Sequence, residues 1–162
     1  MNHSSPAVLH LLCGRIASGK STLAQQLAQV PGSVLICEDQ WLAQLYPDLI
    51  HSVADYLLHA QRLGNTLGPL VVAMLQAGTS VVLDFPANTL VQRAGLRAWA
   101  DQAGVDHQLH VLNADEDTCR ARLRERNQQG NHPFTTSEEE FELICRYFVP
   151  AQASEGLHIV NH

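Results

Sequence analysis

The sequence predicts an α/β protein built on a parallel β-sheet, and three observations support this prediction. Short apolar runs rich in β-branched residues alternate with longer stretches of helical periodicity along the 162 residues. Most of the short runs are continuously hydrophobic, as expected for strands that are covered on both faces. A glycine-rich segment, Gly14 to Ser21, follows the first run and leads directly into a helical stretch, an order typical of phosphate-binding α/β proteins.

The amino-terminal part of the chain predicts two strands and the helix between them. The first strand is expected over residues 7–13, and the helix over residues 20–30, where leucines recur at helical spacing. A Pro-Gly pair at 31–32 stops this helix. The second strand is expected over residues 34–37, and a further helix is expected to begin near Gln40.

The middle of the chain predicts two helical regions around a third strand. Residues 51–77 have helical periodicity, and we expect two helices there, broken near Gly64 or Gly68. The third strand is expected over residues 80–83. The next helix, over residues 89–103, ends at a glycine, as helices commonly do.

The last third of the chain completes the sheet with two strands, expected over residues 107–112 and 157–160. A helix over 115–127 has an acidic first turn that suits the helix dipole. Residues 128–136 contain a glycine and a proline and predict a mobile loop. Ser137 and Glu140 form a capping box that starts the last helix, so the glutamates at 138–140 are interpreted as a solvated helix start.

Composition indicates one ordinary globular domain that needs no disulfide or metal for its core, with 46% hydrophobic and 16% charged residues. No apolar run could span a bilayer, and the first residues lack the layout of a signal peptide, so we expect a cytoplasmic protein without membrane contact. The four cysteines have no zinc-site spacing and are expected to be buried free thiols. The nine histidines are interpreted as structural or surface residues.

Charge is distributed unevenly along the chain. The net charge is −6, which argues against a nucleic-acid partner, because such partners usually require a basic surface. Lys20 is the only lysine, and four of the nine arginines fall within residues 120–126. Positive charge is therefore concentrated in two places, as a polyphosphate site requires.

The segment from Gly14 to Ser21 matches the phosphate-loop pattern GxxxxGK[ST] at every fixed position. Its glycines let backbone N–H groups face phosphate oxygens, and the dipole of the next helix adds positive potential. Lys20 is expected to reach the β- and γ-phosphates of ATP, and the hydroxyl of Ser21 to ligate Mg²⁺. The expected nucleotide-binding residues of the loop are Gly14, Ala17, Ser18, Gly19, Lys20, Ser21 and Thr22.

Sequence motifs and chain length distinguish three classes of phosphate-loop protein. A GTPase would carry an [NT]KxD motif, which is impossible because the only lysine lies in the phosphate loop. An AAA+ module is usually longer and has a hydrophobic run that ends in Asp-Glu, whereas the run here ends in Leu83-Asp84-Phe85. A small kinase is the class that these observations favour.

Carboxylates that follow the second and third strands support the small-kinase interpretation. The carboxyl ends of parallel strands meet beside the phosphate loop, so Asp39, with Glu38 as second choice, is expected to accept the proton of a substrate hydroxyl. Asp84 is expected to orient Mg²⁺, with Asn88 as a weaker member of the same polar cluster. In the alternative interpretation Glu38 and Asp39 only cap the next helix and Asp84 only ends its strand.

The arginine cluster provides two further candidates. Arg122 and Arg126 flank the buried stripe of the helix expected over 115–127, whereas Arg120 and Arg124 are expected to be solvated. Arg126 is expected to move onto the γ-phosphate as a lid residue, and Arg122 to lie near the nucleotide base or phosphates. The alternative is a surface helix whose arginines pair with its own glutamates.

With these residues assembled, the chain resembles the P-loop kinases of the nucleoside-kinase group. More narrowly, it resembles small AAA-domain proteins that are similar to chloramphenicol phosphotransferase, the zeta toxins and the kinase half of polynucleotide kinase. The resemblance covers nearly the whole chain and rests on GRIASGKS, the aspartate after the second strand, LDFPAN and RLRERN.

The resemblance implies a P-loop NTPase three-layer sandwich with a five-stranded parallel sheet in the order 2-3-1-4-5. It also implies a single domain over 1–162 with a small helical lid at about 120–137. Asp39 is implied as general base, Lys20 and Ser21 as phosphate and Mg²⁺ ligands, and Arg126 as a lid arginine. Polynucleotide kinases carry an arginine soon after the base, whereas here no lysine or arginine lies between Asp39 and Arg62, which argues against a nucleic-acid acceptor.

The segment over residues 41–78 leaves the second strand beside the proposed base and should line the acceptor pocket. Its aromatic and polar residues suit a neutral or hydroxylated small molecule better than a polyanion; they are Trp41, Tyr46, His51, Tyr56 and His59. We therefore expect an ATP-dependent phosphotransferase that moves the γ-phosphoryl group to a hydroxyl of a small molecule. The alternative is a nucleotide-binding module or slow NTPase switch that acts through a protein partner.

Overall fold

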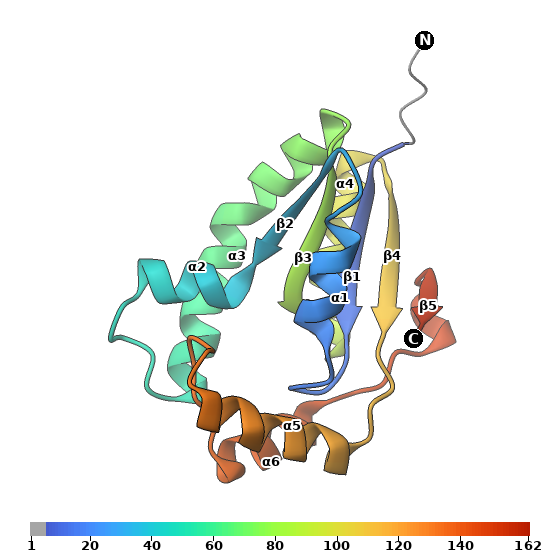
Figure 1. Cartoon of the computed structure of the whole chain (residues 1–162). Coiled ribbons are helices and arrows are strands. Elements are labelled where there is room, and N and C mark those ends of the chain that lie inside the picture. Colours follow the sequence, from blue (N-terminus) through green and yellow to red (C-terminus); the bar gives the residue numbers. More distant parts are fainter. Residues whose placement is uncertain (1–5) are drawn as a thin grey trace.

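The centre of the protein is a sheet whose five strands run parallel in the order β2-β3-β1-β4-β5. It is seen in a computed structural model that describes residues 6–162 (Figure 1). The strands are β1 (Val8–Cys13), β2 (Ser33–Cys37), β3 (Ser80–Pro86), β4 (Asp106–Val111) and β5 (Ile159–Asn161). The predicted strand order is confirmed, and every predicted strand is present with ends that differ by at most three residues.

Helices cover both faces of the sheet and its carboxyl end (Figure 1). They are α1 (Lys20–Leu27), α2 (Glu38–Leu45), α3 (Val53–Gln76), α4 (Leu90–Ala103), α5 (Glu116–Gln129), α6 (Glu138–Tyr147) and the short 3₁₀ helix η1 (Ala153–Glu155). α1 packs on one face, and α3 and α4 pack on the other, so the sheet is the middle of three layers. α5 and α6 lie across the end where the strand arrows point, which is where a ligand of a parallel sheet is expected.

The alternation of side chains along β1 divides the core into these layers. Leu9 and Leu11 face α3 and α4, whereas Leu12 faces α1 and packs with Ala24 and Val82. All five of these side chains are buried. The continuous apolar strands of the sequence thus serve two cores of different composition on opposite faces.

The prediction of two helices over 51–77 is wrong, because α3 is one helix of 24 residues. Pro69 lies inside it and supplies no N–H, which costs about 3 kcal/mol in a helix interior. Four buried side chains at helical spacing, Leu63, Leu67, Val71 and Leu75, offset this loss, since each contributes roughly 1.5–3 kcal/mol when fully buried. A Cβ at Gly68 would lie 2.9 Å from Trp99 Nε1, so this glycine allows α3 to approach α4 closely.

Several helix ends are formed as the sequence predicts. α4 ends at Gly104, which has a φ of 69°, and the capping box of Ser137 and Glu140 starts α6. The remaining helix that the sequence indicated, α2, begins at Glu38, two residues before the predicted start. This earlier start places Glu38 and Asp39 in the first turn of a helix that points away from the sheet edge.

The cysteines are free, as predicted, although only Cys13 and Cys119 are fully buried. Three histidines form a hydrogen-bonded row beside β1 and β4, with 3.0 Å from His10 Nδ1 to His110 Nε2 and 2.9 Å from His110 Nδ1 to His162 Nε2. Burial lowers the pKa of His110 to about 4, so it is neutral at physiological pH. These contacts agree with a structural role.

Asp106, His107 and His158 form the one three-residue group among residues 6–162 whose spacing could hold a metal ion. The two imidazole rings stack with an interplanar angle of only 10°, and His107 Nε2 already accepts a hydrogen bond from the backbone N–H of His158. His158 Nδ1 also lies 2.7 Å from Asp106 Oδ1, so the polar groups of this cluster already pair with one another.

Candidate active site

The phosphate loop lies between β1 and α1 with its backbone in a conformation that favours glycine. Gly19 has a φ of 102° and Ala17 a φ of 60°, both in the left-handed region. A Cβ at Gly14 would lie 2.5 Å from Ser18 Oγ, so only glycine fits there. These constraints explain the residue types at the fixed positions of the motif.

Lys20 is folded over the phosphate loop. Its Nζ donates to the backbone carbonyls of Gly14, at 2.6 Å, and Arg15, at 2.9 Å. Burial lowers the pKa of Lys20 to about 8, against the opposing charges of Asp84 and Asp39. The only lysine of the chain is thus positioned at the loop, within electrostatic reach of both candidate carboxylates.

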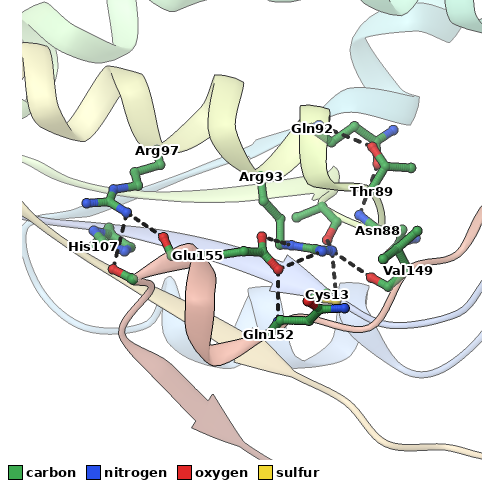
Figure 2. Close-up of polar contacts among 12 residues, drawn as sticks. Cys13, Asn88, Thr89, Gln92, Arg93, Arg97, His107, Val149, Gln152 and Glu155 are labelled. Carbon is green, nitrogen blue, oxygen red and sulfur yellow. Dashed lines mark hydrogen bonds and ion pairs between the residues drawn. The ribbon is translucent and has the colours of Figure 1, made fainter.

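Asn88 anchors the start of the phosphate loop to the end of β3. Its Oδ1 accepts the N–H of Gly14 at 2.9 Å, and its own N–H donates to Gln92 Oε1 at 3.0 Å (Figure 2). The carbonyl of Asn88 also accepts the N–H of Val149 at 2.8 Å. Asn88, expected as a weaker member of the Mg²⁺ cluster, is therefore engaged by the loop backbone.

Arg93 on α4 joins the loop region to the carboxyl-terminal segment, as Figure 2 shows. It is fully buried, and its guanidinium donates to Glu155 at 2.7 and 3.0 Å and to the carbonyls of Ala87 at 3.1 Å and Val149 at 2.9 Å. Next to Val149, the ring of Phe148 lies 4.7 Å from the guanidinium of the loop residue Arg15. We call the contacts of Arg93 with Glu155, Ala87 and Val149 the Arg93 clasp.

Sequence reasoning missed the Arg93 clasp, although the helical pattern contained a signal for it. Arg93 lies three and seven residues before Leu96 and Ala100, both of which are buried on α4. An arginine at such a position is on the buried face of its helix. Glu155 gave no comparable signal, because it lies in η1 after an irregular segment.

The two carboxylates after β2 meet one phenol group from α3. Tyr56 Oη lies 2.6 Å from Glu38 Oε1 and 2.7 Å from Asp39 Oδ1. The start of α2 has Cys37 as N-cap, with no side-chain capping bond, so the interpretation of these carboxylates as helix caps is not supported. Glu38 is 5% exposed, and burial raises its pKa to about 7.

Asp39 also contacts the loop between α5 and α6. His132 Nε2 lies 3.2 Å from Asp39 Oδ2, and Phe134 packs edge-on against Tyr56 with 5.8 Å between ring centroids. Burial raises the pKa of Asp39, but the hydrogen bonds from His132 and Tyr56 and the charge of Arg126 outweigh it, so this pKa lies below its ordinary value. Asp39 is therefore ionised at neutral pH.

His132 is the site residue that sequence reasoning missed, since all histidines were interpreted as structural or surface. The only available signal was its position in the glycine- and proline-containing stretch predicted as a mobile loop. The contact depends on how α5 and α6 bring that loop over α2. Pattern reasoning has no access to this arrangement.

The arginines of α5 divide into two pairs. Arg126 is half-buried near Asp39, and its Nε has no hydrogen-bond partner among the described residues. Burial lowers the pKa of Arg126, and the charge of Asp39 opposes this shift. Arg122 Nη1 lies 3.4 Å from the carbonyl of Ser18 in the phosphate loop, where it donates a long hydrogen bond.

The other pair joins α5 to α6. Arg120 and Arg124 bind the two oxygens of Glu138 at 2.6 and 2.5 Å, and Arg120 lies over the ring of Phe141 at 4.7 Å. The expectation that Arg120 is solvated is wrong, because its side chain is only 22% exposed. It lies over Phe141, which belongs to the small core that holds α5, α6 and the phosphate loop together.

One cavity of about 1110 Å³ connects most of the candidate residues. Ala17, Gly19, Lys20, Ser21, Thr22, Asp39, Asp84, Arg122, Arg126 and His132 all line it. His51 and Tyr56 line it as well, whereas Trp41, Tyr46 and His59 do not. Tyr46 and His59 stack on each other with 4.0 Å between ring centroids.

Gly14 and Ser18 belong to the phosphate loop, but they are buried and do not line this cavity. A smaller recess of about 400 Å³ is lined by residues that include Arg15, Asn113, Phe148 and Pro150. The phosphate loop thus contributes residues to two hollows, Arg15 to the smaller and Lys20 to the larger.

The 2-3-1-4-5 parallel sheet with a phosphate loop after its central strand defines a P-loop NTPase fold. The sequence profile of the AAA domain family matches residues 9–151. The chain therefore belongs to this family and to the AAA/P-loop kinase group.

Solved structures share the fold at low identity. A Chloroflexus aurantiacus protein classed as a kinase has a TM-score of 0.69 and 23% identity over 99% of this chain and 87% of that chain. A chain of the Pnkp1/Rnl/Hen1 RNA repair complex has a TM-score of 0.66 and 20% identity over 90% of this chain and 45% of that chain. The APS kinase CysC of Mycobacterium tuberculosis, bound to AMPPNP and APS, has a TM-score of 0.53 and 22% identity over 78% of this chain and 76% of that chain.

No curated protein matches the sequence. Over residues 6–162, none of the helices combines the length and the apolar character that a membrane crossing needs.

Proposed function

We propose that the chain is an ATP-dependent phosphotransferase that moves the γ-phosphoryl group to a hydroxyl of a small molecule. One observation carries this proposal: a single cavity of about 1110 Å³ contains both Lys20 of the phosphate loop and Asp39. Ligand pockets usually measure roughly 300–1,000 Å³. The cavity therefore has room for the phosphates of a nucleotide together with an acceptor.

The phosphate loop would hold the nucleotide with backbone N–H groups and with Lys20. The carbonyls of Gly14 and Arg15 that now accept from Lys20 Nζ would give way to the β- and γ-phosphate oxygens. The smaller recess beside Arg15 would take the nucleoside, because the carboxylates required for transfer line the larger one.

Ser21 and Asp84 fit a Mg²⁺ ion. Both line the large cavity, and one hydroxyl with one carboxylate is the kind of sparse protein ligand set that Mg²⁺ accepts beside phosphate oxygens and water. The only described hydrogen bond to the Asp84 carboxylate is a long one, 3.5 Å from Cys37 Sγ to Oδ2. Mg²⁺ would supply charge neutralisation on the β- and γ-phosphates.

Asp39 would accept the proton of the acceptor hydroxyl as the hydroxyl oxygen attacks the γ-phosphorus. Its lowered pKa keeps it ionised, and its Oδ2 lies on the side of the loop that covers the cavity. Arg126, whose Nε has no hydrogen-bond partner among residues 6–162, would contact the transferred phosphoryl group, and Arg122 the phosphates near Ser18. Residues 120–137 would act together as the lid.

The lining of the cavity supports a neutral small molecule as acceptor. Its only lysine and arginines are Lys20, Arg122 and Arg126, which a triphosphate would occupy. The rest of the cavity lining includes several apolar side chains, those of Ile50, Val53, Leu57, Phe134 and Leu143. A polynucleotide acceptor would need further cations for its own phosphates.

Turnover of Mg²⁺-ATP by the purified protein, alone and with a panel of hydroxylated compounds, tests the proposal. Phosphorylation of one compound class is expected, and Asp39→Asn should lower its rate about 10²- to 10⁴-fold while ATP affinity stays nearly constant. Unchanged transfer by Asp39→Asn would exclude Asp39 as base. ATP binding without transfer to any compound would favour the nucleotide-dependent switch instead.

A further inference from the structure

Two carboxyl groups meet a single hydroxyl group beside the phosphate loop. Tyr56 Oη lies 2.6 Å from Glu38 Oε1 and 2.7 Å from Asp39 Oδ1. Both distances are those of strong O–H···O hydrogen bonds, and each such bond needs a proton between its two oxygens. The phenol supplies one proton, so one of the carboxyl groups must carry the second.

The surroundings assign this second proton to Glu38. Glu38 is 5% exposed, and the described groups that act on it besides Tyr56 are the negative carboxylates of Asp39 and Asp84. Asp39 is instead stabilised in its charged form by His132 at 3.2 Å and by the charge of Arg126. The side chain of Asp39 is also 30% exposed, so its ionised form retains some hydration.

We propose that Glu38 and Tyr56 are positioning residues for Asp39, an inference that rests on the proposed role of Asp39 as base. Protonated Glu38 donates to the Tyr56 oxygen, and the Tyr56 hydroxyl donates to Asp39 Oδ1. This chain of hydrogen bonds fixes Oδ1 and leaves Oδ2, the oxygen beside His132, for the acceptor hydroxyl. Only Asp39 takes the substrate proton; Glu38 and Tyr56 keep theirs.

The arrangement has a consequence for pH dependence. When Glu38 loses its proton near pH 7, two carboxylates compete for the single proton of the phenol, and Asp39 loses its fixed donor for part of the time. Four titratable groups surround the hydrogen-bonded row of Glu38, Tyr56 and Asp39. They are Lys20 on α1, Asp84 on β3, Arg126 on α5 and His132 in the loop over 130–137. The hydrogen bond from His132 and the charge of Arg126 act on Asp39, so neither replaces the lost proton of Glu38.

Infrared difference titration of the purified protein tests the proton arrangement without any acceptor. We expect a C=O band of a protonated carboxyl group that disappears with a midpoint near pH 7. The band should be absent from Glu38→Gln. In Tyr56→Phe it should shift, because the Glu38 carboxyl group loses its hydrogen-bond acceptor. The absence of such a band above about pH 6 would overturn the proposal.

Steady-state turnover tests the positioning role. Tyr56→Phe should lower kcat about 10- to 100-fold, the effect of one lost hydrogen bond to a charged group, with ATP affinity unchanged. The kcat of Glu38→Gln should not decline between pH 6 and 8, in contrast to that of the wild type, because its amide donates to the phenol oxygen at every pH. Tyr46→Phe, which alters the stacked pair with His59, is the control and should behave as wild type.

A wild-type kcat in Tyr56→Phe, or an alkaline decline that persists in Glu38→Gln, would contradict the positioning role. Thermal denaturation of each variant separates these effects from loss of folding. If Asp39→Asn retains transfer, the proposed base is wrong, whereas the infrared result still decides where the proton lies. Failure of the proposed function and failure of this positioning role are thereby distinguished.

Discussion

Substitution of Arg93 by methionine should destabilise the protein severely, although Arg93 lies outside the candidate active site. The substitution removes the guanidinium bonds to the Glu155 carboxylate and to the carbonyls of Ala87 and Val149, and Glu155 Oε1 keeps only the backbone N–H of Gln152 among its described donors. Breaking a buried ion pair by removing one partner costs about 3–5 kcal/mol. Because the Glu155 side chain is 12% exposed and can recruit water, we expect the lower end of this range, about 3 kcal/mol.

Urea unfolding followed by circular dichroism measures this loss. A loss of about 3 kcal/mol is large beside the roughly 5–15 kcal/mol that stabilises a typical native protein. Arg97→Met is the matched control, because Arg97 lies one turn later on α4 and its side chain is 35% exposed. Its ion pair with Asp101, at 3.6 Å, contributes at most about 1 kcal/mol, although its bonds to the carbonyls of Glu155 and Gly156 are lost as well.

The double variant Arg93→Met/Glu155→Met completes the test. Replacing both members of a buried pair by apolar residues is often neutral, so the double variant should recover much of the stability that Arg93→Met loses. A positive coupling of about 2 kcal/mol between the two sites is expected. A loss below about 1 kcal/mol in Arg93→Met, or equal effects of Arg93→Met and Arg97→Met, would refute the buried clasp.

Three further stability predictions can be measured by denaturation. Gly68→Ala should cost about 1–3 kcal/mol because its Cβ meets Trp99, whereas Gly64→Ala, with open space around it on the same helix, should stabilise by up to about 1 kcal/mol. Ser137→Ala should cost about 1 kcal/mol through its lost N-cap bond. The pKa of Glu38 is about 7 in the folded protein and 4.5 in the unfolded chain, so the folded state is favoured while Glu38 carries its proton. This contribution to the free energy of unfolding is fully present below pH 4.5 and is lost, by up to about 3 kcal/mol, as the pH rises to 7. Glu38→Gln should abolish this pH dependence.

The sheet was predictable because its signals are local. A short continuous apolar run rich in β-branched residues, such as Val81 to Leu83, is typical of a strand covered on both faces, and the phosphate loop indicates which strand is central. The break in 51–77 was mispredicted because Gly68 and Pro69 are local helix breakers, whereas the apolar stripe and the contact with Trp99 that hold α3 together are tertiary. Tertiary packing overrode propensity at this one place.

The candidate site was predictable where residue order alone brings groups together. Lys20 follows β1 and Asp39 follows β2, and the carboxyl ends of these parallel strands place both residues at one cavity. His132 lies 93 residues after Asp39, and their contact depends on how α5 and α6 fold over the strand ends. Glu38 was ranked second as base, and only its burial and its contact with Tyr56 indicate a different role.

These contacts connect the proposed lid over residues 120–137 to both halves of the proposed reaction. α5 carries Arg126 towards the phosphate side of the cavity, and the loop that follows it places His132 on Asp39 Oδ2. The ion pairs of Arg120 and Arg124 with Glu138 hold α5 and α6 together as one unit. Because Arg126 and His132 belong to the same unit, movement of the lid should bring charge to the phosphoryl group and change the environment of the base in a single step. An acceptor hydroxyl that needs Asp39 Oδ2 must then share this oxygen with His132 or displace it, so acceptor binding and lid position should be coupled through Asp39.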